Sequence, residues 1–164
     1  ENVGASIARP EKPQLYFYGN VVQEAILNIP KIYPTISVDN YVVMPNHIHL
    51  LLQENKEPIE LVMKRIATRF VYWYNIKYQR VGHLFQDRFK SEPVENDEYF
   101  LTVIRYIHQN PVKAGICKKP QDYNYSSYNE FFRKETLVDC GFVFGMIETD
   151  DFIKCNNEKA FEQC

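Results

Sequence analysis

The sequence lacks several features that mark common functional classes. It has four cysteines, Cys117, Cys140, Cys155 and Cys164, and no two of them stand at a Cys-x-x-Cys spacing. This absence excludes the usual zinc-knuckle and redox motifs. The sequence also contains no signal or transit peptide and no apolar run of membrane-spanning length. We therefore expect a cytoplasmic protein with no membrane partner.

The net charge of −2 hides an uneven distribution along the 164 residues. Residues 58–91 carry seven basic side chains against two acidic ones, and residues 135–164 carry seven acidic side chains against two basic ones. A basic middle favours a polyanionic partner, although an ordinary solvated helix face gives the same pattern. The length suits one domain. Because the chain begins with Glu1 rather than Met, we expect its natural start to lie upstream.

Hydrophobic periodicity and turn residues predict an α+β fold. We expect helices from Asn20 to Pro30, from Pro58 to about Gln79 and from about Glu98 to Gln109, with strands over Thr35–Met44, His47–Gln53 and about Ser91–Val94. The last helix should end before Pro111, because proline disfavours a helical residue in front of it. This order predicts a ferredoxin-like antiparallel sheet with helices packed on it. Residues 1–14 read as a loop or flexible arm, and Glu158–Gln163 as a short terminal helix.

Two histidines stand on one face of the second predicted strand. Side chains two positions apart in a strand point the same way, so His47 and His49 share a face. Two imidazoles side by side on a rigid strand form half of a metal site. Two partly buried histidines with hydrogen-bonded rings would explain the same pattern.

The helix over 98–109 supplies candidates for the other half. Tyr106 lies about 100° from the centre of the apolar stripe of this helix, and Asn110 projects over nearly the same flank. The amide oxygen of Asn110 suits a hard cation. A divalent metal that polarises a phosphodiester would offset the weak nucleophilicity of a tyrosine hydroxyl. On composition alone, however, Tyr106 is one ordinary aromatic among 12 tyrosines.

Three blocks of sequence resemble one known family. They are Met44-Pro45-Asn46-His47-Ile48-His49, then residues 82–89 (Gly-His-Leu-Phe-Gln-Asp-Arg-Phe), then residues 105–115 (Arg-Tyr-Ile-His-Gln-Asn-Pro-Val-Lys-Ala-Gly). In order and spacing they resemble the REP-associated tyrosine transposases, which belong to the single-tyrosine HUH transposases of small bacterial insertion sequences. The resemblance covers roughly residues 21–132.

The resemblance implies an enzyme that cuts and rejoins single-stranded DNA near hairpins, with Mg²⁺ or Mn²⁺ as cofactor. It implies a five-prime phosphotyrosine on Tyr106, and a metal held by His47, His49 and Asn110. Our candidates for DNA contacts are Arg65, Arg69, His83, Arg88 and Lys90. We expect three regions: a flexible arm over 1–14, the catalytic domain over 15–132 and an acidic extension over 133–164.

The chain departs from the family pattern at its start. The family begins with a central strand, and here only Leu15–Tyr18 precedes the first predicted helix. We therefore expect the first strand to be missing or shortened. This leaves two alternatives to the transposase: a hairpin-DNA-binding module that does not cut, and a metal-dependent hydrolase that uses activated water. The choice between monomer and homodimer stays open.

Overall fold

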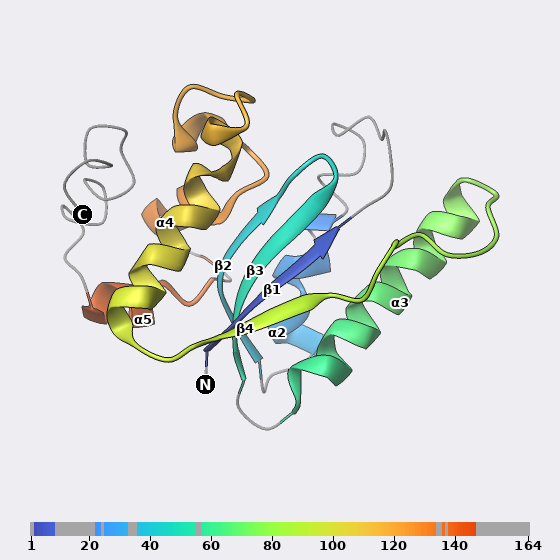
Figure 1. The fold of residues 1–164 in the computed structure, drawn as a ribbon, viewed down its shortest axis with the longest axis horizontal. Coiled ribbons are helices and arrows are strands. Elements are labelled where there is room, and N and C mark those ends of the chain that lie inside the picture. The colour runs from blue at the N-terminus through green and yellow to red at the C-terminus, as the bar shows by residue number, and fades with distance from the viewer. Residues whose placement is uncertain are drawn as a thin grey trace.

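Four antiparallel strands form the centre of the structure (Figure 1). The computed structural model describes residues 2–8, 22–23, 25–32, 36–54, 57–133, 136 and 138–146. The strands are β1 (Asn2–Ala8), β2 (Ile36–Val43), β3 (His47–Glu54) and β4 (Lys90–Val94), in the order β2-β3-β1-β4. With helices following β1 and β3, this order is the predicted ferredoxin-like arrangement.

The first strand lies in the segment that we expected to be a loop or flexible arm. β1 pairs with β3 on one side and with β4 on the other, so it is a central strand. The prediction of a missing or shortened first strand was therefore wrong, as was that of a flexible arm at residues 2–8; residues 9–14 lie outside the described residues. The segment is rich in small residues, so its sequence predicts a strand only weakly. Backbone pairing with β3 and β4 along both of its edges stabilises the strand. Leu15–Tyr18 lies outside the described residues.

Two long helices and one short helix accompany the sheet. They are α3 (Ile59–Lys77), α4 (Asp97–Lys113) and α2 (Ile29–Ile32); residues 22–23 and 25–27 are also helical. The predicted stop at Pro30 was wrong, because helical backbone continues to Ile32. The α3 helix matches the prediction within two residues at its end.

The helix α4 runs through Pro111 instead of ending before it. Its N-cap is Asn96, whose side chain accepts the backbone N–H of Tyr99 at 2.8 Å. At the other end, Ile116 N–H donates to the Pro111 carbonyl, and Gly115 takes a φ of +68°. A glycine in this left-handed conformation is a common helix terminator. The predicted end was wrong because the bias against helix before proline is a preference that buried packing of Pro111 overrides.

Both faces of the sheet are covered. Leu50, Leu51 and Leu52 are consecutive on β3 and all are buried, which requires packing on each face. The helix α4 packs on β2 and β3. In Figure 1, α3 and α4 lie on opposite sides of the strands. This arrangement brings α4 beside the strand that carries the histidine pair.

The chain after α4 returns to the core. It forms the short helices η1 (Pro120–Asp122), η2 (Ser127–Phe132) and α5 (Cys140–Met146). In α5, Val143 is fully buried and the Phe142 ring packs against Phe100 of α4. The start of the predicted extension is thus part of the core rather than separate from it, while Glu158–Gln163 lies outside the described residues. Among the helices that the structure describes, none could span a membrane.

Candidate active site

The two histidines of β3 stand together at the start of that strand. Their ring centroids are 4.7 Å apart with an interplanar angle of 79°. His47 Nδ1 lies 2.6 Å from the side-chain oxygen of Asn46. An amide oxygen can only accept, so this contact favours the tautomer with the proton on Nδ1. The Nε2 atom of His47 then keeps its lone pair for a cation.

Burial keeps both imidazoles neutral. Burial lowers the pKa of His47, and a hydrogen bond with the Asn110 side chain partly offsets this. For His49, burial and the neighbouring His47 lower the pKa to about 4. His49 Nε2 is buried and has no hydrogen-bond partner. A buried nitrogen without a partner is costly, which makes this atom a candidate metal ligand.

Tyr106 faces the histidine pair from α4. Its ring centroid lies 5.2 Å from that of His49 in an edge-to-face contact. The side chain is 46% exposed, whereas the next residue, Ile107, is buried in the core. The backbone of Tyr106 is therefore fixed by packing while its side chain reaches open space. This is a suitable situation for a nucleophile that must meet a large substrate.

Asn110 lies one helical turn beyond Tyr106 and reaches His47. The fold thus brings together His47, His49, Tyr106 and Asn110, which the sequence had singled out. The orphaned Nε2 of His49, the imidazole of His47 and the amide oxygen of Asn110 fit a divalent cation. Among the described residues, no three His, Cys, Asp or Glu side chains form a metal-binding group. A metal at this site would therefore need Asn110 as its third protein ligand.

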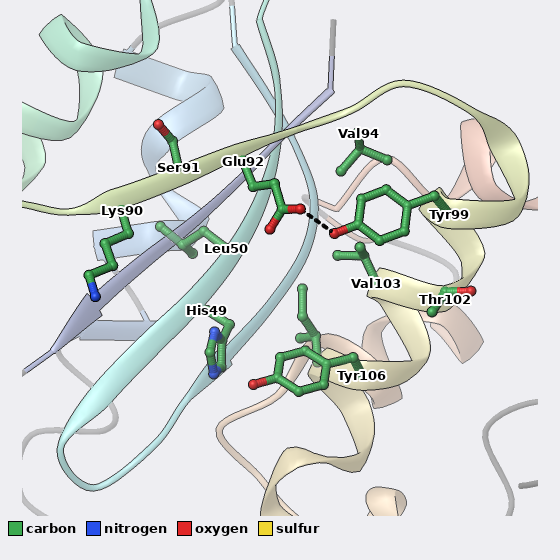
Figure 2. Close-up of a pocket in the computed structure, with 11 residues that line it drawn as sticks. His49, Leu50, Lys90, Ser91, Glu92, Val94, Tyr99, Thr102, Val103 and Tyr106 are labelled. Carbon is green, nitrogen blue, oxygen red and sulfur yellow. Dashed lines mark hydrogen bonds between the residues drawn. The ribbon is translucent and has the colours of Figure 1, made fainter.

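A pocket of about 500 Å³ opens beside the Tyr106 and His49 rings (Figure 2). It lies between β4 and α4. Glu92 and Tyr99 face each other at its far end, where the Tyr99 hydroxyl donates to Glu92 Oε1 at 2.9 Å. This bond raises the pKa of Tyr99. Sequence reasoning missed both residues, although Glu92 follows Lys90 at strand spacing and Tyr99 precedes Tyr106 by two helical turns.

The five predicted DNA contacts lie in three places. Lys90 lines the pocket beside the candidate active site. His83 and Arg88 line a second hollow, in the loop between α3 and β4. Arg65 and Arg69 are exposed on α3, and Arg65 forms an ion pair with Glu57 at 2.9 Å. Only Lys90 is thus adjacent to the candidate active site.

A buried polar network contacts α4 on its packed side. His108 is fully buried and its Nε2 lies 3.3 Å from the hydroxyl of Ser127. The same hydroxyl hydrogen-bonds Asn40 and accepts the backbone N–H of Tyr41 at 3.0 Å. Asn40 also donates to the Ile104 carbonyl in α4. The network joins α4 to β2 and η2 and so fixes the helix that carries Tyr106. No periodic pattern in the sequence indicates this network.

The chain is similar to known transposases. The family described as "Transposase IS200 like" matches residues 17–110. A REP-associated tyrosine transposase of Escherichia coli is 24% identical over 111 residues, which is 66% of this chain and 64% of that protein. A candidate REP-associated tyrosine transposase of Haemophilus influenzae is 28% identical over 57% of this chain. The chain spans 59% of the length of that relative.

A solved structure has the same fold. It is a REP-associated tyrosine transposase bound to a REP hairpin, with a TM-score of 0.69 and 19% identity, and the match covers 81% of this chain and 79% of that one. At 19% identity this likeness supports the fold alone. The family match extends over more than half of the chain and includes the histidine pair, Tyr106 and Asn110. The chain therefore belongs to the IS200-like transposase family.

Proposed function

We propose that the protein is a metal-dependent endonuclease and strand transferase for single-stranded DNA, and that it acts through a covalent phosphotyrosine on Tyr106. The observation that carries the proposal is the contact between Tyr106 and His49, with centroids 5.2 Å apart. It places a half-exposed tyrosine side chain beside a pair of neutral imidazoles. Membership of a transposase family supports a DNA-processing role for this cluster.

The proposed step exchanges one phosphodiester for another. The Tyr106 hydroxyl oxygen attacks phosphorus and loses its proton, and the bond from phosphorus to the 3′ oxygen breaks. The departing oxygen takes up a proton and becomes a free 3′ hydroxyl. The five-prime phosphate remains on Tyr106. Because the new bond is also a phosphodiester, a 3′ hydroxyl can reverse the step and join strands.

His47, His49 and Asn110 would hold Mg²⁺ or Mn²⁺. Both histidines are available as ligands near neutral pH because burial lowers each pKa. A bound divalent ion would stabilise the negative charge that develops on the phosphoryl oxygens. The protein's own contribution is to orient the ligands: Asn46 sets the tautomer of His47, and α4 fixes Asn110 beside it.

Hairpin or single-stranded DNA is the proposed substrate. The related solved transposase is bound to a REP hairpin. Here the exposed cations of α3 and of the α3–β4 loop, together with Lys90, provide basic surface for a phosphate backbone. Arg69, His83 and Arg88 join Lys90 as proposed contacts, and Arg65 contributes less because Glu57 already pairs with it.

The test uses a labelled hairpin oligonucleotide with single-stranded flanks, in Mg²⁺ or Mn²⁺, analysed on a denaturing protein gel. We expect a labelled band at the mass of the protein, absent in Tyr106→Phe and in His47→Ala. A band that persists in Tyr106→Phe would refute the assigned nucleophile. Cleavage without any adduct would favour the hydrolase that uses activated water.

The alternative is a hairpin-DNA-binding module that does not cut. It rested partly on the expected absence of the first strand, and the presence of β1 in the centre of the sheet removes that support. The basic surface still favours it. A mobility shift on a native gel without metal, and no adduct under any of the conditions above, would establish this alternative.

A further inference from the structure

We propose that the pocket between β4 and α4 is a base-binding subsite, which takes a base next to the scissile phosphate and favours bases with an exocyclic amino group over thymine. The inference rests on the proposed function, because the base belongs to the strand that Tyr106 would cut. It goes further in assigning a sequence preference to Glu92 and Tyr99.

The pocket is continuous with the candidate active site. His49 and Tyr106 form one end of it, and Glu92 and Tyr99 lie at the other (Figure 2). Tyr99 and Tyr106 are seven residues apart on one helix, which corresponds to about 10 Å along the axis. One nucleotide can bridge this distance. A strand with its phosphate at Tyr106 can therefore place a neighbouring base in the pocket.

The interior of the pocket suits the flat face of a base. Leu50, Val94, Val103 and Ile107 provide apolar walls, and the Tyr99 ring adds an aromatic surface. A volume of about 500 Å³ lies in the range of small-molecule sites. Enzymes that act on nucleic acids commonly hold an unstacked base between apolar and aromatic side chains. The pocket provides this environment at the edge of the sheet.

Among the described residues that line the pocket, only Glu92 carries a carboxylate. An ionised carboxylate only accepts hydrogen bonds, and each oxygen has more than one acceptor position. The Tyr99 hydroxyl occupies one position on Oε1 and holds the group in place. The remaining positions can accept from the amino groups of adenine, cytosine or guanine. Thymine presents carbonyl oxygens flanking its one N–H, and these would face the negative charge.

Lys90 is placed to neutralise the phosphate of the same nucleotide. Lys90 and His49 both pair with Ser6, from opposite sides of β1, so their side chains share one face of the sheet. Their Cα atoms are therefore about 10 Å apart, two strand spacings. Glu92 follows on the same face two residues later. Along β4, the Lys90 cation thus lies nearer the candidate active site, and the Glu92 acceptor lies nearer the bound base.

The experiment selects from a pool of hairpin oligonucleotides whose single-stranded flanks are randomised. One arm sequences the DNA covalently attached to the wild-type protein. The other arm sequences DNA bound by the Tyr106→Phe protein, which needs no chemistry. Each arm is repeated with Glu92→Gln, whose amide can donate as well as accept, and with Glu95→Gln as a matched control. Glu95 is exposed and does not line the pocket.

We expect thymine to be depleted about tenfold or more at one position next to the cleavage point, in both arms. Glu92→Gln should restore thymine there while yields on other bases change less, and Glu95→Gln should keep the depletion. Unchanged preferences in Glu92→Gln, or no depletion of thymine in the wild type, would overturn the subsite. No adduct, with a Glu92-dependent preference in the binding arm, would overturn the strand transfer and keep the subsite.

Discussion

The Tyr106 ring meets the His49 ring edge to face at an interplanar angle of 73°. One residue comes from a central helix and the other from the strand beneath it, 57 positions earlier in the sequence. The contact keeps the tyrosine hydroxyl beside two imidazoles that burial holds neutral.

Divalent metal should stabilise the folded protein through the histidine pair. We expect Mn²⁺ at about a hundred times its Kd to add about 2.7 kcal/mol to the free energy of unfolding at pH 7.5. His49→Gln should lose most of this gain, because it removes the buried nitrogen that lacks a partner. Thermal unfolding with and without Mn²⁺ measures the effect. His83→Gln is the control, since His83 is exposed and remote from the pair; an equal loss there would contradict the assigned ligands.

His49 should also make the metal-free protein sensitive to acid. Its folded pKa is about 4, below the ordinary value of 6.5, so the unfolded chain takes up the proton first. Stability should therefore be fully present above pH 6.5 and fall as the pH drops from about 6.5 to about 4. Urea unfolding at half-unit pH steps in EDTA measures the slope. His49→Gln should flatten the curve in this window, and an unchanged curve would show that His49 titrates normally.

Removal of Lys90 should weaken DNA binding in a salt-dependent way. If Lys90 contacts one phosphate, Lys90→Ala should lower the slope of log affinity against log salt by about 1. Titrations of a hairpin oligonucleotide at salt concentrations between about 50 and 200 mM measure this slope. Arg65→Ala should change it less, because Arg65 is paired with Glu57. A larger change in the slope for Arg65→Ala than for Lys90→Ala would indicate that the DNA lies over α3 instead of over β4.

Ser127 should act as a positioning residue for α4. Ser127→Ala removes the hydroxyl that contacts His108, Asn40 and the Tyr41 backbone, and we expect a loss of about 1–3 kcal/mol in unfolding free energy. The rate of adduct formation should fall several-fold at saturating DNA, while the DNA dissociation constant stays nearly unchanged. Denaturant unfolding and single-turnover kinetics measure the two effects. Thr68→Ala, on the exposed side of α3, should change neither.

Asp39 should destabilise the protein at neutral pH. It is the extra residue of a β-bulge in β2, fully buried, and neither carboxylate oxygen has a hydrogen-bond partner. Burial, with a smaller effect of Asp139, raises its pKa to about 7. The folded protein thus keeps Asp39 protonated up to about pH 7, whereas the unfolded chain ionises it near pH 4. The stabilising contribution of this proton is full below about pH 4 and is lost as the pH rises to about 7.

We therefore expect Asp39→Asn to stabilise the protein by about 1–3 kcal/mol at pH 8, with a gain that shrinks below pH 7. Urea unfolding at pH 5 and pH 8 measures this difference. Asp87→Asn, at an exposed site, should be neutral at both pH values. A gain from Asp39→Asn that is the same at pH 5 and pH 8 would contradict the burial of an ionisable carboxyl.

Most local elements, and the residues proposed for the cluster, could be predicted from the sequence. Strand periodicity placed His47 and His49 on one face, and helical periodicity placed Tyr106 and Asn110 on one flank of α4. These patterns arise from backbone geometry alone, so neighbours in sequence suffice to detect them. Motif resemblance then indicated the family, which the family match confirms.

Features that depend on contacts between different segments could not be predicted from the sequence. β1 is a strand because β3 and β4 pair with both of its edges, although its small residues carry little strand signal. The Glu92–Tyr99 pair and the Ser127 network join residues 7 and up to 87 positions apart. Burial likewise sets the pKa of His49 and Asp39, because desolvation depends on what packs around a group and not on its neighbours in the chain.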